Sequence, residues 1–198
     1  MDAHEIIDTW TRWDADRATT KSLVQQVMEY TLPRRATVTV QRAEGEDLHR
    51  ELFDSTSETA AERGASGLYG AMCPSDRAWF MLTPPIEGGR QAGDFSHAML
   101  GVSEQMRDQM ARSNFAEAAY EAFLDLMTAG RCTVEPARGR HALLRYTAYP
   151  FEQVVFAEDA EGRPAHVLRR FTWTARQIVE EFGEGEDRVG KSVWQAHE

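Results

Sequence analysis

The sequence contains three glycines at three-residue spacing: Gly64, Gly67 and Gly70. They follow a run of hydroxyl and acidic residues, so they could form a phosphate-binding loop. A P-loop needs Lys and then Ser or Thr after its last glycine, and a dinucleotide fingerprint needs its first two glycines one residue apart, directly after a strand. Neither condition is met. The spacing instead places the glycines along one face of a helix. Each Gly in a helix interior lowers helix stability by about 0.8–1 kcal/mol relative to Ala, and close packing against another element would offset this loss. We therefore predict a packing stripe, and expect a branched side chain at Gly67 to disrupt packing or assembly.

Histidine and carboxylate side chains suited to metal binding occur at two places. His4, Glu5 and Asp8 approach the spacing of a zinc-protease helix, but the second histidine of that motif is missing. The other place is a group of three carboxylates: Asp94, Glu104 and Asp108. Acidic residues on solvent-exposed helix faces explain both groups more simply, so we predict no catalytic residue, no metal site and no cofactor. A small metal-dependent hydrolase stays open as an alternative.

The cysteines and methionines offer two further candidates. Cys73 and Cys132 are far apart and lack CxxC spacing, which favours a reducing compartment and two buried, unreactive thiols. Five methionines form a soft apolar set: Met72, Met99, Met106, Met110 and Met127. Core filling explains this set most simply, but an adaptable surface that binds a partner helix would make the chain a non-catalytic interaction module.

The composition is that of a globular protein with an acidic surface. The 198 residues carry 32 acidic and 22 basic side chains, for a formal charge of −10, and 42% of the residues are hydrophobic. This charge balance argues against general nucleic-acid binding, which relies on excess Lys and Arg. The amino terminus lacks the features of a signal peptide, and no apolar run approaches the length of a membrane span. We therefore expect a cytoplasmic protein without a membrane partner.

Apolar residues at three- and four-residue steps predict helices in the first two thirds of the chain. Residues 4–31 are predicted to be helical with a break near Thr19-Thr20, and Pro33 ends this segment. Residues 34–52 are predicted to form a polar loop with one possible short strand at 37–40. The further predicted elements are a helix at 56–71 opened by a capping box at Ser55–Glu58, a buried strand at 79–82, a glycine-rich turn at 86–94, a helix at 96–111, and a helix from 115 that Ser113-Asn114 cap and Gly130 closes.

From Cys132 onward the apolar period changes to two, which is the period of β-strands. Strands are predicted at 142–146, 153–157 and 165–171, the last two joined as an antiparallel hairpin. A second capping box at Thr174–Gln177 opens a short helix that ends at Gly183. The predicted fold class is α+β, with amino-terminal helices followed by a small antiparallel sheet and a short helix. The whole chain is predicted to be a single region, helical at about 1–130 and β-rich at about 131–183.

Four separate stretches of the sequence, taken in order, form a pattern that spans nearly the whole chain. Its positions are Trp13, Pro33, Arg34 and Arg35; Phe53, Asp54, Ser55, Thr56, Ser66, Gly67, Trp79 and Phe80; Ser113, Asn114 and Phe115; and Arg170, Phe171, Thr174, Gln177, Phe182 and Gly183. This pattern resembles the amino-terminal portion of the portal (head-to-tail connector) protein family of short-tailed bacteriophages. The order and spacing of the four stretches together make the resemblance specific.

The resemblance implies a non-enzymatic structural subunit with a portal wing-like fold. Portals of this family are similar in forming a homo-oligomeric ring, a dodecamer when full length, through which phage DNA is packaged and ejected. The implied partners are other copies of the chain, the terminase, capsid and tail proteins, and double-stranded DNA that passes without sequence-specific binding. The implied location is the virion, at the portal vertex of the capsid, and the host cytoplasm during assembly. Family members continue well beyond the Phe182-Gly183 motif, so we expect an amino-terminal fragment or a shortened form, of phage or prophage origin.

Overall fold

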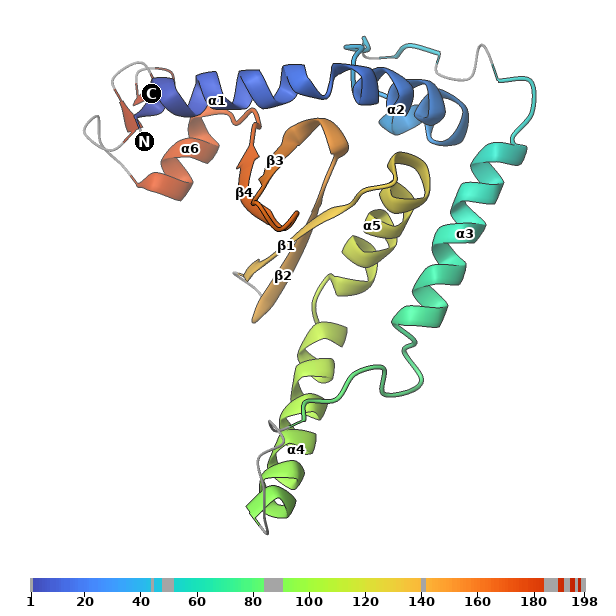
Figure 1. Ribbon diagram of the computed structural model, residues 1–198, viewed down its shortest axis with the longest axis vertical. Coiled ribbons are helices and arrows are strands. Elements are labelled where there is room, and N and C mark those ends of the chain that lie inside the picture. The colour runs from blue at the N-terminus through green and yellow to red at the C-terminus, as the bar shows by residue number, and fades with distance from the viewer. Residues whose placement is uncertain are drawn as a thin grey trace. The chain divides into compact units, whose positions relative to one another are not determined.

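A computed structural model describes residues 2–43, 45–47, 52–83, 91–139, 142–183, 189–190, 193–194 and 196. In chain order, the elements are α1 (Ala3–Asp16), α2 (Ala18–Thr31), the 3-10 helix η1 (Pro33–Arg35), α3 (Thr56–Met72), α4 (Gln91–Ala111), α5 (Phe115–Ala129), β1 (Thr133–Arg138), β2 (Leu144–Tyr149), the 3-10 helix η2 (Phe151–Gln153), β3 (Val154–Glu158), β4 (Pro164–Arg169) and α6 (Ala175–Phe182) (Figure 1). Helices precede two small antiparallel sheets, so the predicted α+β class is confirmed. In this described part, no helix combines the length and apolarity needed to cross a lipid bilayer.

The chain separates into two compact units, residues 1–167 and residues 168–198. The second unit contains α6, which begins with the predicted capping box. Its Thr174 hydroxyl accepts from the Gln177 N–H at 3.3 Å, and the Thr174 N–H donates to the Gln177 side chain at 2.9 Å. Gly183 follows α6 with a φ of 93°, a conformation that favours glycine. The division of one region into a helical and a β-rich part stays a prediction.

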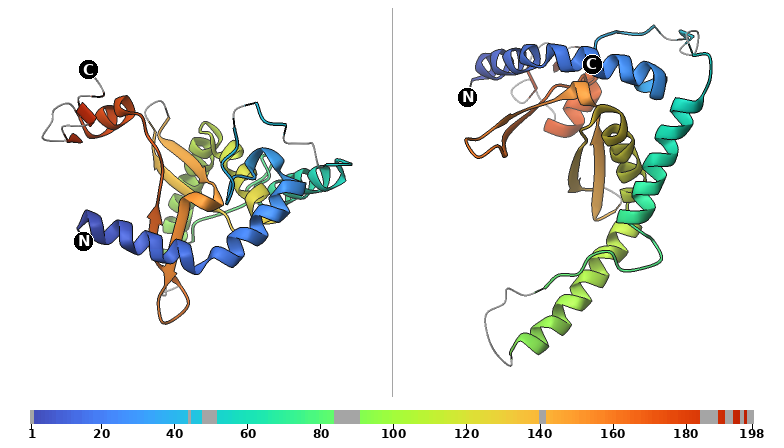
Figure 2. Two further views of the ribbon diagram at one scale, coloured as in Figure 1. Left: turned by 90° about the horizontal axis from the view of Figure 1, so that it is seen from above. Right: turned by 45° about the vertical axis from the view of Figure 1, so that its right-hand side comes forward.

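The first two helices meet at Arg17, where the backbone leaves the helical conformation. α1 begins with a capping box at Asp2 and Glu5, whereas α2 begins without a side-chain cap. Figures 1 and 2 show the two helices following one another with a change of direction between them. The predicted break near Thr19-Thr20 is therefore misplaced. The junction is fixed by long-range hydrogen bonds of the Arg17 side chain rather than by a local hydroxyl cap.

Two apolar clusters hold the first unit together. α3 and α5 lie side by side around Leu32, Ala65 and Leu124, against which Tyr120 and Phe123 are partly buried. The second cluster joins α2, the segment after η1, and η2: Val24, Met28, Ala36, Val38 and Phe151. Both clusters combine residues that are far apart in the sequence, and the second, which contains Phe151, gives the helical and β-rich parts a shared core.

The side chain of Gln25, a buried residue of α2, holds the segment that follows η1. Its amide donates to the Ala36 carbonyl at 3.0 Å and accepts from the Thr39 N–H at 3.1 Å, as the backbone of a neighbouring strand would. Arg42 donates to the same Ala36 carbonyl at 3.3 Å. The predicted strand at 37–40 is wrong, because this backbone pairs with a side chain and bends. This part of the predicted loop is nevertheless anchored on α2.

The β-rich part contains a hairpin of which the sequence analysis predicted one strand, β2, and missed the other, β1. β1 pairs antiparallel with β2, with Thr133 opposite Tyr149 and Arg138 opposite Leu144. β1 is mostly exposed and contains Pro136, so neither an apolar alternation nor strand propensity marks it. β3 and β4 form the predicted second hairpin.

Asn114 joins the beginning of α5 to β2. Its side chain donates to the Tyr146 carbonyl at 2.7 Å and accepts from the Tyr146 N–H at 2.8 Å. The Ser113 hydroxyl instead accepts from the Phe115 N–H at 3.2 Å. The predicted capping role of Asn114 is therefore wrong, because its amide pairs with strand backbone. Gly130 ends α5 with a φ of 69°, as predicted.

The beginning of α3 depends on Asp54 rather than on Ser55. Ser55 makes no side-chain cap, and the predicted capping box is wrong. The Asp54 carboxylate accepts from the Thr56 N–H at 2.7 Å, and hydrogen bonding to Thr56 holds the pKa of Asp54 below its ordinary value. The predicted extent of this helix is confirmed to within a residue or two.

The predicted buried strand at 79–82 is wrong. These residues have no regular structure and are half-buried or exposed. Their backbone contacts a helix, since Arg107 of α4 donates to the Phe80 carbonyl at 2.9 Å, and no ladder forms among the described neighbours. Of the predicted glycine-rich turn, residues 86–90 lie outside the described residues and 91–94 belong to the first turns of α4.

The three glycines of α3 differ in what lies against them. A Cβ built at Gly64 would come within 2.6 Å of the Met127 methyl group of α5, so this glycine sits in a close helix contact. A Cβ at Gly67 or Gly70 would meet nothing within 4 Å in this chain. The expected contact inside the chain therefore occurs at Gly64. Close packing of another element at Gly67 and Gly70 stays a prediction.

Replacing Gly67 by Ala should raise the free energy of unfolding by about 0.5–1 kcal/mol, because the site is open and Ala favours helix. Thermal unfolding of the monomer should then shift upward by about 2–4 °C per kcal/mol gained. Gly64→Ala is the matched control, since the Met127 methyl must move and cancel part of the same gain. A Gly67→Ala variant less stable than Gly64→Ala would contradict this reading.

Candidate functional site

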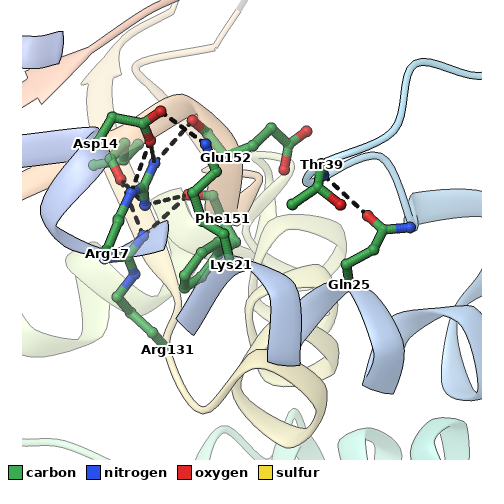
Figure 3. A network of polar contacts seen from close by, with 9 residues as sticks. Asp14, Arg17, Lys21, Gln25, Thr39, Arg131, Phe151 and Glu152 are labelled. Carbon is green, nitrogen blue, oxygen red and sulfur yellow. Dashed lines mark hydrogen bonds and ion pairs between the residues drawn. The ribbon is translucent and has the colours of Figure 1, made fainter. Parts of the chain in front are cut away.

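A set of polar contacts between distant segments centres on the turn that contains η2 (Figure 3). The Arg17 guanidinium donates to the carbonyl oxygens of Phe151 and Val154 at 3.0 and 2.8 Å, and to that of Glu152 at 3.1 Å. Arg17 lies at the junction of α1 and α2, whereas the turn lies in the β-rich part. One side chain therefore binds three carbonyls of a single turn and joins it to the helices.

Arg131 reaches the same turn from the end of α5. Its Nη2 donates to the Phe151 and Val154 carbonyls, each at 3.0 Å. Its guanidinium carbon lies 4.2 Å from the ring centroid of Phe151 and 4.9 Å from that of Phe156. Arg17 contacts the Phe151 ring as well, at 4.9 Å. Cation–π contacts and carbonyl dipoles thus stabilise two guanidinium groups around one buried phenylalanine.

Arg17 and Lys21 have a carboxylate partner at this junction, whereas Arg131 has none among the described residues. The Asp14 carboxylate accepts from Arg17 at 2.8 Å and from Lys21 at 2.7 Å. Burial would raise the pKa of Asp14, but the hydrogen bonds from Lys21 and Arg17 outweigh it and lower that pKa. Burial, reinforced by the charge of Arg17, lowers the pKa of Arg131 to about 10. In the described residues no carboxylate pairs with Arg131, so the junction carries an excess of positive charge.

A second charged pair joins η1 to α5. Arg35 contacts one oxygen of Asp125 at 3.2 Å, and the Asp125 side chain is only 2% exposed. Its other oxygen has no hydrogen-bond partner among the described residues. Burial raises the pKa of Asp125 to about 6, the charge of Arg35 opposes this, and the charges of Glu152 and Glu121 add to it. This buried carboxylate is therefore incompletely compensated.

Aromatic residues from the second and third resembling stretches come together. Trp79 stacks on Phe115 at 5.8 Å with 10° between the rings, and Phe115 meets the Tyr146 ring edge-on at 5.1 Å. Phe80 packs edge-on against Trp79 at 4.8 Å. A cavity of about 470 Å³ lies beside this cluster, lined also by Arg107. The contacts connect the chain after α3, the beginning of α5, and β2.

The other positions of the resembling pattern lie elsewhere. In the first unit, Pro33 is buried, Arg34 is exposed, Arg35 binds Asp125, and Ser66 lies on an exposed face of α3. Phe53 is fully exposed, at 101% of its reference area. Trp13 lines a cavity with Arg17 and Arg131.

Three aromatic residues of the second unit form a small cluster of their own. The Trp173 ring lies 4.5 Å from that of Phe171 and 6.3 Å from that of Phe182. The Arg169 guanidinium stacks over Phe171 at 4.4 Å. The fourth resembling stretch thus packs on itself around the capped helix α6.

The candidate metal ligands have structural partners or lie apart. Glu5 accepts from the Asp2 N–H in the capping box of α1, and Asp108 pairs with Arg112 at 3.0 Å. Searched over the described residues, His, Cys, Asp and Glu form no group of three that could hold a metal ion. For Asp94, the structure describes only its place in α4.

The thiol prediction is half right. Cys73 is buried as expected, and burial raises the pKa of its thiol. Cys132 is exposed, because it follows the helix-ending Gly130 and precedes the mostly exposed strand β1. Three of the methionines, Met72, Met106 and Met127, are about half exposed, although the Met127 methyl group also packs against Gly64.

Comparison with known proteins identifies the family. The sequence model of the bacteriophage head to tail connecting proteins matches residues 3–198. The chain belongs to this connector family. It is 26% identical over 179 residues to a probable portal protein of Bordetella phage BPP-1, and 24% identical over 143 residues to the portal protein of Salmonella phage epsilon15. These alignments cover 90% and 72% of this chain but 32% and 25% of the two relatives, so it spans a third of their length or less.

Several residues of the connector chain were missed as site residues by the sequence analysis. Asp14 and Arg17 are three residues apart in the first resembling stretch, a spacing that favours an ion pair in a helix. For Arg131 and Asp125 the sequence carries no local signal, because their partners are brought together by the fold.

Replacing Arg17 by Met should lower the free energy of unfolding by about 2–4 kcal/mol, because three carbonyls lose a charged donor and Asp14 loses a partner. Urea unfolding followed by circular dichroism measures the change. Arg12→Met is the matched control on the same helix, since Arg12 is exposed and should give a change within about 0.5 kcal/mol. Equal stabilities of the two variants would contradict the structural role of Arg17.

Replacing Asp125 by Asn should stabilise the connector chain at pH 7–8. Its folded pKa of about 6 lies above the ordinary 3.8, so the folded state binds this proton more tightly. The stability from Asp125 is therefore present below pH 3.8, is lost as pH rises to 6, and stays constant above that. A pKa difference of this size corresponds to about 3 kcal/mol.

Unfolding measured from pH 4 to pH 8 tests this pH dependence. The stability of wild type relative to Asp125→Asn should fall by about 2–3 kcal/mol across the range. Asp108→Asn is the control, since that carboxylate is 52% exposed. A wild-type stability that rises relative to Asp125→Asn across this range would reverse the sign and refute the buried, undercompensated carboxylate.

Proposed function

We propose that this chain is a structural, non-enzymatic subunit of a phage portal, the head-to-tail connector ring through which DNA is packaged and ejected. The observation that carries the proposal is the family match over residues 3–198. Two relatives named as portal proteins support it, and the matched 32% and 25% of their lengths support a part of such a protein. That this part is the amino-terminal, wing-like one is proposed from the four resembling stretches.

The proposed assembly is a homo-oligomeric ring, a dodecamer, at the portal vertex of the virion, built in the host cytoplasm. Terminase, capsid and tail proteins are its proposed partners, and double-stranded DNA passes through the ring without sequence-specific contacts. The formal charge of −10 supports the last point, because an acidic wall repels the phosphate backbone and lets DNA slide.

Exposed apolar side chains support a subunit that makes contacts beyond its own fold. Phe53 is fully exposed and belongs to a resembling stretch, while Met72 at 56% and Phe95 at 49% expose further apolar area. A large aromatic side chain in water is unfavourable by a few kcal/mol relative to a buried one. Phe53 is therefore our proposed contact residue between subunits.

Light scattering behind size exclusion, over a range of protein concentrations, tests the assembly. We expect one discrete large oligomer, and negative-stain microscopy of that fraction should show rings. A chain that remains monomeric up to millimolar concentration would contradict assembly through this region.

Replacing Phe53 by Ser should weaken association at least tenfold while leaving thermal unfolding of the monomer unchanged, because Phe53 makes no buried contact in the isolated chain. Leu143→Ser is the matched control, since Leu143 is 59% exposed and lies outside the resembling stretches. If both variants assemble as wild type does, Phe53 is not a contact residue.

A further inference from the structure

A cavity of about 560 Å³ opens beside the Arg17 and Arg131 junction. Three aromatic residues line it together with both arginines and with Asp16: Trp13, Phe151 and Phe156. Figure 3 shows Arg17 and Arg131 converging from different segments on the turn at Phe151. Aromatic rings and guanidinium groups therefore line the same cavity.

The donors of Arg131 are only partly used. Its Nη2 binds the Phe151 and Val154 carbonyls, whereas its Nε and Nη1 have no hydrogen-bond partner within the described part of the chain. A guanidinium carries five N–H groups in a planar fork, and a carboxylate can accept two of them side by side. Both two-donor edges of the guanidinium include Nη2, which is already used, so Arg131 keeps its Nε–H and Nη1–H groups as separate donors, each of which suits a single carboxylate oxygen.

The charge balance around the cavity also favours an anion. Arg17 and Lys21 share Asp14, and Asp16 lines the cavity without pairing to any described cation. Arg17, Lys21 and Arg131 against Asp14 and Asp16 leave one uncompensated positive charge. Half-burial of Arg131 makes that charge costly, and a bound carboxylate would relieve the cost.

We propose that this cavity binds the carboxylate of an acidic side chain from a second copy of this chain, with Arg131 as the contacting residue. The inference rests on the proposed ring function. Charge complementarity selects the occupant, because a chain with 32 acidic and 22 basic residues offers many carboxylates to a cationic cavity. The aromatic walls would hold the apolar stem of Glu or Asp.

The first test measures carboxylate binding in solution by NMR. Acetate is titrated at constant ionic strength, with chloride as the balancing ion, while the side-chain Nε–H signal of Arg131 and the indole signal of Trp13 are followed. We expect saturable shifts of both signals in wild type. Asp16→Asn, which removes the repelling carboxylate, should bind acetate at least threefold more tightly, and Arg131→Gln should lose saturation. The absence of saturable shifts in wild type would overturn the proposal.

A parallel titration with inorganic phosphate distinguishes the anion class. Binding of phosphate more than tenfold tighter than acetate would overturn the assignment of a carboxylate. Because Arg131→Gln also removes carbonyl contacts, Arg131→Lys serves as a second variant that keeps the charge but loses the planar fork. It should bind acetate at least threefold more weakly than wild type does.

The second test measures association by sedimentation for the same variants. Arg131→Gln should weaken association at least tenfold, Asp16→Asn should strengthen it, and acetate should compete with wild-type association. If wild type and Arg131→Gln associate with equal affinity, this inference is wrong, but the proposed ring function is not contradicted. Wild type that binds acetate yet never associates overturns the second copy as occupant, and with it assembly through this region.

Discussion

The fold of the first unit depends on supplying donors to the carbonyls of one turn. The chain at 151–154 places the Phe151, Glu152 and Val154 carbonyls within reach of arginines rather than of another strand. Buried carbonyls without partners cost free energy, so these must be satisfied. Arg17 and Arg131 do so from the two ends of the helical part, and the β-rich part is thereby tied to the α1–α2 junction and to the end of α5.

The arginine contacts to this turn have an electrostatic cost, which shows in the pKa values of two residues near the end of α5, Arg131 and Asp125. Burial lowers the pKa of Arg131, and repulsion from the Arg17 guanidinium around the same ring lowers it further. One turn earlier, Asp125 is buried against a single contact to Arg35, and its pKa is raised. Burial favours the neutral form of each group, so it raises the pKa of the acid and lowers the pKa of the base. The end of α5 is therefore held in a state of incomplete charge compensation.

Local signals predicted the elements well and their contacts poorly. The helices with apolar periodicity, the glycine after α5 and the capping box of α6 follow from residues within one or two turns of each other. The strand β1 was missed because its exposed, proline-containing sequence carries no alternation, and the apolar run at 79–82 is not a strand because its backbone bonds to α4. The roles of Arg17 and Gln25 were missed for a different reason: their partners are backbone groups, which leave no mark on side-chain pattern.

The side-chain amides of Gln25 and Asn114 each bind a stretch of backbone, donating one hydrogen bond to a carbonyl and accepting one from an N–H. This pair of hydrogen bonds requires an amide group, which has an NH₂ donor and an oxygen acceptor. Deamidation would turn the donor into a second oxygen facing the Ala36 or Tyr146 carbonyl, so that attraction at that point becomes repulsion. Both attachments, of the segment after η1 to α2 and of β2 to the beginning of α5, therefore depend on the chemical integrity of a single amide group each.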